Sequence, residues 1–101
     1  MVTHSTVLSI NLGNSSHFDN DNSISTAVWA EKVPGRAKNW YFVLPNLTDS
    51  LDNKRSVDGV VIELFHGAVL SWDGRLICHC TSNTTVGPGN KCFSAFITSL
   101  K

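Results

Sequence analysis

His17 and Asp19 stand two positions apart, after the first apolar run of this 101-residue chain. On an extended backbone, side chains at positions i and i+2 project to the same face, so this imidazole and this carboxylate could bind one ion. His79, much further along the chain, is the candidate for a third ligand. Two histidines and one carboxylate leave three coordination positions of a metal open, which is the ligand set of non-haem Fe(II) oxygenases.

The histidine and the aspartate also fit a simpler interpretation, a solvated turn pair or a local cap that needs no metal. The three cysteines are an odd number without the spacing of a disulfide framework. Cys78 and Cys80 flank His79, so on a strand they point to the opposite face. They could bind zinc together with Cys92, but the spacing matches no common zinc site. We expect buried thiols instead.

Short apolar runs separated by turn signals must position these side chains. The β-branched residues valine, isoleucine and threonine far outnumber alanine and glutamate, and this composition favours strands. Turn signals about every ten residues predict an all-β sandwich, jelly roll or barrel of about seven strands. The predicted strands are residues 6–12, 24–29, 40–44, 60–65, 68–72, 76–81 and 92–98.

Turn residues predict how these strands connect. Pro45 ends one apolar run, and the polar residues 46–58 that follow are expected to form an exposed loop. Asp73-Gly74 between two apolar runs predicts a type I′ hairpin, which pairs residues 70–72 with residues 76–79. In that register His79 faces inward, and the flanking cysteines face the other way. His66 precedes a glycine at a corner, where it is either a substrate contact or a turn histidine held by backbone.

Composition and charge limit the classes of function. Eight basic and eight acidic side chains give a net charge of zero with neutral histidines, so no nucleic-acid partner is indicated. Hydrophobic residues make up 42% of the chain and charged residues 16%, which predicts one globular domain over residues 1–101. No window reaches the roughly 18 to 20 apolar residues of a membrane span. Because the first residues also lack a secretory signal, we expect an intracellular protein, cytoplasmic or nuclear, with no membrane partner.

The segment GAVLSWDGRLICH, residues 67–79, resembles a segment of the Fe(II)- and 2-oxoglutarate-dependent dioxygenases. The resemblance spans roughly residues 7–96 and implies a double-stranded β-helix, or jelly roll. It also implies that His17, Asp19 and His79 are the iron ligands. Complete domains of that family place further strands and helices before the His-x-Asp pair, whereas only a short segment precedes it here. The resemblance therefore implies a single but incomplete catalytic core.

The same resemblance implies a cation for the distal carboxylate of 2-oxoglutarate. The family uses an arginine, or in some branches a lysine, a short distance beyond the last histidine ligand. Lys91 follows His79 at a comparable spacing and is the only matching cation apart from Lys101. A solvated charge at the end of a loop is an equally good interpretation of Lys91. Ser94 could add a hydroxyl if a bulge turns it to the same face.

Two residues are candidates for substrate contacts. Asn11 alternates with Ile10 and would face a pocket or solvent, and Trp29 would line the pocket or belong to the core. We expect an Fe(II)- and 2-oxoglutarate-dependent dioxygenase that hydroxylates an organic substrate of unidentified class. The alternative is a non-catalytic jelly-roll module for binding or interaction. Exposed sheet edges in an incomplete core would favour pairing with another chain.

Overall fold

The computed structural model describes residues 3–19, 24–51 and 55–100. These residues form no helix, and hence none that is long and apolar enough to cross a membrane. The prediction of an all-β fold is therefore confirmed. The seven strands are β1 Thr3–Ile10, β2 Ile24–Glu31, β3 Tyr41–Leu51, β4 Arg55–Glu63, β5 Val69–Asp73, β6 Cys80–Thr81 and β7 Cys92–Leu100.

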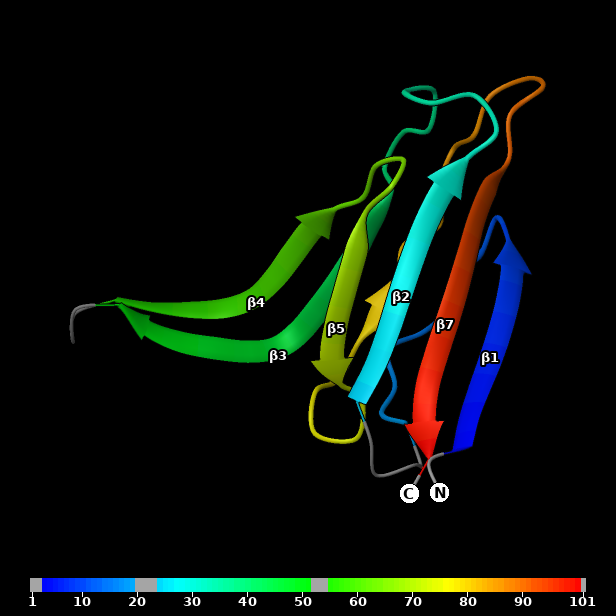
Figure 1. Ribbon diagram of the computed structural model, residues 1–101. Helices are drawn as coiled ribbons and strands as arrows, with labels where there is room; N and C mark the ends of the chain where they lie inside the picture. The colour runs from blue at the N-terminus through cyan, green and yellow to red at the C-terminus, as the bar shows by residue number, and fades with distance from the viewer. Residues whose placement is uncertain (1–2, 20–23, 52–54, 101) are drawn as a thin grey trace.

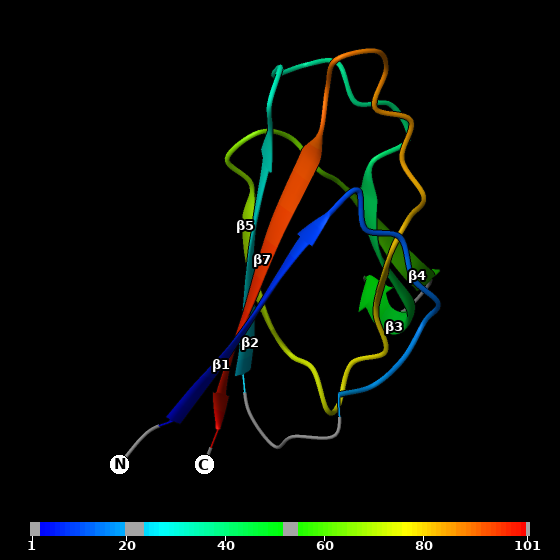
Figure 2. The same cartoon turned by 90° about the vertical axis from the view of Figure 1, so that its right-hand side faces the viewer.

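The strands form two antiparallel sheets. One sheet has the order β1-β7-β2-β5, and the other has the order β4-β3-β6. Figures 1 and 2 show the two sheets as separate layers, with β7 lying between β1 and β2. Within the larger sheet, Phe96 of β7 pairs with Val7 on one side and with Ala27 on the other. After β1, the chain crosses to the layer of β3 and β6, and this crossing carries His17 and Asp19 (Figure 2).

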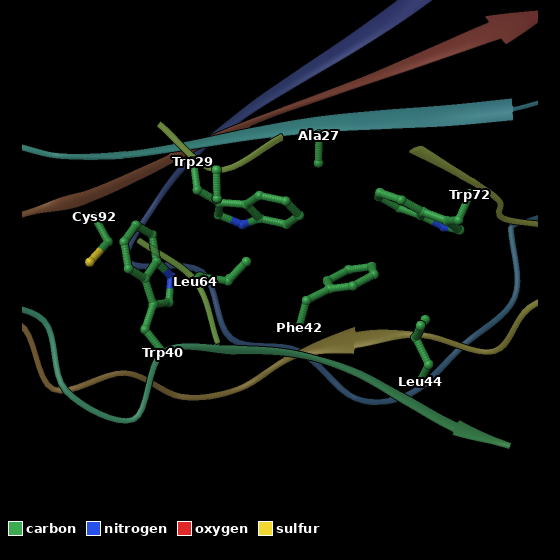
Figure 3. Close-up of a cluster of buried hydrophobic side chains, with 9 residues drawn as sticks. Ala27, Trp29, Trp40, Phe42, Leu44, Leu64, Trp72 and Cys92 are labelled. Atoms are coloured by element: carbon green, nitrogen blue, oxygen red, sulfur yellow. The ribbon is translucent and has the colours of Figure 1, made fainter. Parts of the chain in front are cut away.

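Alternation along the strands creates the core between the sheets. Every second residue of β2 from Ser25 to Glu31 is buried and faces the other layer. Trp29 packs on Phe42 with ring centroids 5.4 Å apart, and Phe42 packs on Trp72 at 4.6 Å. Figure 3 shows Trp72 at one end of this cluster and Cys92 at the other. The buried cluster consists of Ala27, Trp29, Trp40, Phe42, Leu44, Leu64, Ala68, Trp72 and Cys92.

The predicted hairpin at Asp73 and Gly74 is wrong. Strand β5 pairs with β2, and the chain after Gly74 crosses to the other sheet, where β6 pairs with β3. The carboxylate of Asp73 accepts hydrogen bonds from the N–H groups of Arg75 and Leu76, both within 3.2 Å. Gly74 does not have the positive φ that a type I′ turn requires. The local bonds of Asp73 therefore make a crossing turn rather than a hairpin.

The expected loop over residues 46–58 is also wrong in part. Strand β3 continues through Pro45 to Leu51, and β4 begins at Arg55, while residues 52–54 lie outside the described residues. The pairing shifts register between Leu44 and Thr48, and an irregular position of this kind tolerates a proline that has no N–H to donate. As a result β3 and β4 form one long curved hairpin that extends beyond the other strands (Figure 1).

Candidate metal centre

Backbone pairing brings the two predicted metal-binding segments together. His17 and His79 form an isolated antiparallel bridge, in which each N–H donates to the other carbonyl at 3.0 Å. On either side of this bridge, Asn14 N–H donates to Thr81 O at 3.1 Å and Asp19 N–H donates to Gly74 O at 2.7 Å. Residues 14–19 therefore lie along residues 74–81. These main-chain bonds bring the third candidate ligand, His79, next to the first two, although it is far from them in the sequence.

The three candidate ligands converge on one point. Asp19 Oδ1 lies 3.6 Å from His17 Nε2 and 3.3 Å from His79 Nε2. All three candidate ligand atoms lie within 4.8 Å of one another. Metal-to-ligand bonds of about 2.0 to 2.2 Å need only a small closing movement from this arrangement. The cluster could therefore hold one metal ion.

Hydrogen bonds at the far side of each imidazole fix which nitrogen is free. His17 Nδ1 lies 2.9 Å from Ser15 O, and His79 Nδ1 lies 2.8 Å from Ile77 O. A carbonyl oxygen can only accept, so each Nδ1 carries the proton and donates it. In the neutral form of each histidine, the Nε2 lone pair then faces the carboxylate, and this is the tautomer that a neutral histidine ligand needs.

The two histidines differ in their exposure. His79 is only 4% exposed, and its ring lies 5.2 Å from the ring of Trp72 and 5.8 Å from that of Phe42. The His17 side chain is 42% exposed. One ligand is therefore anchored in the aromatic core, whereas the other closes the site from the solvent side.

Ser25 and Gly74, which the sequence analysis did not assign to the site, determine the position of the Asp19 carboxylate. Ser25, only 2% exposed, donates from Oγ to Asp19 Oδ2 at 3.1 Å, and its Oγ lies 3.3 Å from Thr98 Oγ1. Because Ser25 gives its proton to Asp19, the Thr98 hydroxyl donates to Ser25. A Cβ at Gly74 would overlap Asp19 Oδ2, so the ligand carboxylate occupies space that only a glycine leaves free.

A cavity of about 260 Å³ opens beside the three ligands. Its walls are mainly apolar and include the rings of Phe42, Trp72 and Phe96 together with Val7 and Leu12. Hydroxyl groups complete the lining. The candidate ligands therefore stand at the edge of a small, mostly hydrophobic space, which is the usual form of a site for a small molecule.

The two residues predicted to contact substrate lie away from this cavity. Asn11 has a φ of 53° and its Oδ1 accepts a hydrogen bond from Cys92 N–H at 2.9 Å. Its side chain therefore holds the turn after β1 against β7. Trp29 is 1% exposed and packs in the core, without lining the cavity. The alternation that suggested a pocket-facing Asn11 ends with β1 at Ile10.

The two residues predicted to bind 2-oxoglutarate do not line the cavity either. Lys91 is exposed and directly precedes Cys92. Figure 3 shows Cys92 at the end of the core opposite Trp72. Thr98, which does line the cavity, lies near the other end of β7. An extended chain from Lys91 to Thr98 spans about 23 Å. Ser94 is buried without a hydrogen-bond partner for its Oγ, and it lies opposite Trp29 in the β2–β7 pairing.

The remaining polar candidates are His66 and the three cysteines, and their contacts support the fold. His66 Nδ1 accepts a hydrogen bond from Glu31 N–H at 3.0 Å, which matches the turn histidine held by backbone. Cys78 and Cys92 are buried and Cys80 is half-buried, all with free thiols. Burial, and secondarily the charge of Glu31, raises the pKa of the Cys92 thiol. Among the described residues, no cysteine joins a group that could hold a metal.

Comparison with known proteins gives no match: no family model, no curated protein and no solved structure is similar to this chain. The geometry of the candidate ligands and of the cavity beside them is therefore what indicates a function.

Proposed function

We propose that this chain is an Fe(II)-dependent oxygenase of the jelly-roll type, with His17, Asp19 and His79 as the metal ligands. The observation that carries the proposal is the convergence of one nitrogen from each of two imidazoles and one carboxylate oxygen within 4.8 Å. This ligand set is typical of non-haem Fe(II) oxygenases. The adjoining cavity gives a second molecule access to the same point.

The winding of the chain supports the jelly-roll part of the proposal. The larger sheet has the order β1-β7-β2-β5, and the smaller sheet has the order β6-β3-β4 with the His17 bridge beside His79, just before β6. Each strand of the larger sheet is joined along the chain to the segment at the same position in the other sheet. The joined pairs are β1 with the His17 segment, β7 with β6, β2 with β3, and β5 with β4. A ribbon wound across two sheets in this manner is the plan of a jelly roll.

Bound Fe(II) would supply the activation of O2 in the three coordination positions that this ligand set leaves open. The chain itself orients the two imidazoles through their Nδ1 bonds and holds the carboxylate through Ser25. Phe42 and Trp72 keep water away from the inner ligand, His79. These residues determine where a ligand binds, while the redox chemistry belongs to the metal and its cosubstrate.

Hydroxylation requires a co-reactant of a defined class. O2 gives one atom to a C–H bond, forming an alcohol, and the second atom needs two further electrons. Loss of CO2 from a 2-oxo acid supplies these electrons, and the acid keeps the second oxygen atom as a carboxylate shortened by one carbon. We propose a 2-oxo acid in this role, and 2-oxoglutarate is the one that the sequence resemblance implies. The hydroxylated substrate is proposed only as an organic molecule.

The outer face of the larger sheet supports a second candidate function, a non-catalytic interaction module. Leu8 is 77% exposed, and Ile10 and Val69 are each 59% exposed. Leu8 and Ile10, together with Phe93 and Val28, line an almost entirely apolar depression on this face. Apolar patches of this kind mark interaction sites on soluble proteins. A chain that binds a partner through this face needs no metal chemistry.

Metal titration combined with oxygen uptake distinguishes the two candidates. Calorimetric titration with Fe(II) under argon should give one ion per chain for the wild type and no detectable binding for Asp19→Ala. After oxygen is admitted, the wild type with Fe(II) and a panel of 2-oxo acids should consume O2 faster than the Asp19→Ala variant does. A chain that binds no iron, or that binds iron without this additional uptake, would favour the interaction module.

A further inference from the structure

The chemistry of the cavity walls limits the cosubstrate, and this inference depends on the proposed function. Apart from the candidate ligands, no described residue that lines the cavity carries a formal charge. The polar lining consists of hydroxyl groups and Asn14. Asn14 Oδ1 already accepts a hydrogen bond from Thr81 N–H at 2.8 Å, and the Ser25 hydroxyl already donates to Asp19. The Thr81 hydroxyl is buried without a hydrogen-bond partner, so it offers a neutral donor but no charge.

The described lysines and arginines nearest to the site in the sequence do not supply the missing cation. Lys91 is exposed and directly precedes Cys92, which lies at the opposite end of the core from Trp72. Arg75 follows Gly74 on the exposed crossing turn and does not line the cavity. The distal carboxylate of 2-oxoglutarate would therefore meet hydroxyl groups and aromatic rings but no opposite charge among the described residues of the cavity. Removing a carboxylate from water in this way is strongly unfavourable unless the charge is paired.

The aromatic wall beside His79 suits a hydrocarbon. The ring of Trp72 lies 4.6 Å from that of Phe42 and meets Phe96 edge-on at 6.2 Å. Both Phe42 and Trp72 also contact the ring of His79, so the apolar surface begins directly beside a metal ligand. A volume of about 260 Å³ limits the occupant to a small molecule.

We infer that the cavity accepts a small 2-oxo acid whose tail is uncharged and apolar, and that it discriminates against 2-oxoglutarate. The 2-oxo acid head would chelate the ion held by His17, Asp19 and His79. The tail would lie against Phe42, Trp72 and Phe96. A tail carboxylate at the same position would contact the aromatic rings and gain no cation from the described residues of the cavity.

A matched pair of ligands tests this inference. 2-Oxopentanoate and 2-oxoglutarate have the same five-carbon length and the same chelating head, and they differ in a terminal methyl group or carboxylate. Each acid is titrated under argon into the Fe(II)-loaded wild-type chain, and the visible charge-transfer absorption of the chelate is recorded. We expect 2-oxopentanoate to bind at least tenfold more tightly. Equal affinity, tighter binding of 2-oxoglutarate, or binding of neither acid would overturn the inference.

A charge-insertion variant provides a second measurement. Ser9 lies on β1 and lines the cavity without being a candidate ligand, so Ser9→Lys places an ammonium where the wild type has a hydroxyl. We expect this variant to reduce or reverse the preference for 2-oxopentanoate, and an unchanged preference would contradict the role of the missing cation. Calorimetric Fe(II) binding is measured first. A chain that binds no Fe(II) fails the proposed function, whereas a chain that binds Fe(II) and prefers 2-oxoglutarate fails this inference alone.

Discussion

His17 and His79 exchange both of their backbone hydrogen bonds at 3.0 Å, although they lie far apart in the sequence. This bridge holds their rings with centroids 4.5 Å apart. Because the main chain makes the connection, the pairing of the two segments places both histidines side by side. A bridge of this kind limits the movement of both residues and so lowers the cost of binding an ion.

The exposed ligand can be removed without disturbing the core. His17→Ala should lower the affinity for Fe(II) or Co(II) by at least about tenfold, since even loss of an outer hydrogen-bond partner of a ligand costs that much. An ion present at about 100 times its Kd stabilises the fold by about 2.7 kcal/mol. Urea unfolding with and without Co(II) should show this gain for the wild type. At the same concentration a similar gain in the variant would argue against His17 as a ligand.

Gly74→Ala should displace the metal-binding carboxylate. The added methyl group would overlap Asp19 Oδ2, so Asp19 must turn away from the two histidines and Co(II) affinity should fall by at least about tenfold. Gly87→Ala is the control. Gly87 has a φ of 79° and open space around it, so the alanine should cost about 1 kcal/mol of strain and leave Co(II) affinity unchanged. Equal affinity in both variants would contradict the close approach.

Local sequence patterns were sufficient for one part of the centre. The spacing of His17 and Asp19 placed two ligands on one side of an extended segment, and the structure brings their ligand atoms together. His79 was a candidate third ligand from its residue type, and only the resemblance assigned it to the pair, because no local pattern links segments so far apart in the chain. Gly74 was selected for the positive φ of a hairpin, which it does not have. Its role is to leave space for Asp19, a residue that only the folded chain brings near.

For the strands, too, local patterns predicted one part, and pairing with distant segments determined the rest. Alternation predicted β2 and β7 to within a few residues, because one face of each is buried. It did not predict β3 beyond Pro45, where pairing with β4 outweighs the local preference for a turn. Nor did it show that β5 and β6 belong to different sheets. That assignment depends on which distant strand each one meets.

Ser25→Ala should weaken metal binding without removing a ligand. The Ser25 hydroxyl holds Asp19 Oδ2 and leaves Oδ1 facing both histidines, so its loss should lower Co(II) affinity by about 10- to 100-fold. Thr26→Ala is the matched control, because the Thr26 hydroxyl contacts Ser71 at 2.8 Å on the exposed side of the same strand. Calorimetric titration of both variants measures the difference. Equal effects would assign the loss to general destabilisation of β2.

Substitutions at Asn11 test whether it supports the fold or contacts a ligand. Asn11→Gly keeps the φ of 53° accessible but removes the bond to Cys92 N–H, which should cost about 1 kcal/mol of unfolding free energy. Asn11→Ala adds left-handed strain and should cost about 1 kcal/mol more. Urea unfolding measures both values. If Asn11→Gly instead retained wild-type stability and weakened 2-oxo acid binding, the predicted contact with a bound molecule would be supported.

Glu31 should make the free energy of unfolding depend on pH in the acid range. It is 5% exposed at the end of β2, and its carboxylate accepts hydrogen bonds from Gly35 N–H at 2.9 Å and Ala37 N–H at 2.6 Å. Asn90 Nδ2 donates to the same carboxylate at 3.3 Å. Burial by itself raises the pKa of Glu31, but these bonds outweigh it and hold the pKa below the ordinary value of 4.5.

The sign of the pH effect follows from this lowered pKa. The unfolded chain takes up the proton first, so the contribution of Glu31 is fully present above about pH 4.5 and is lost as the pH falls through the folded pKa. At pH 7, Glu31→Gln should be less stable than the wild type by about 1 kcal/mol, because the amide keeps only part of the hydrogen bonding. Urea unfolding followed by tryptophan fluorescence should show this difference shrinking as the pH is lowered below 4.5. Other carboxyl groups titrate in both proteins, so the difference between them isolates Glu31, and a difference that stayed constant through the acid range would contradict the role of its ionised form.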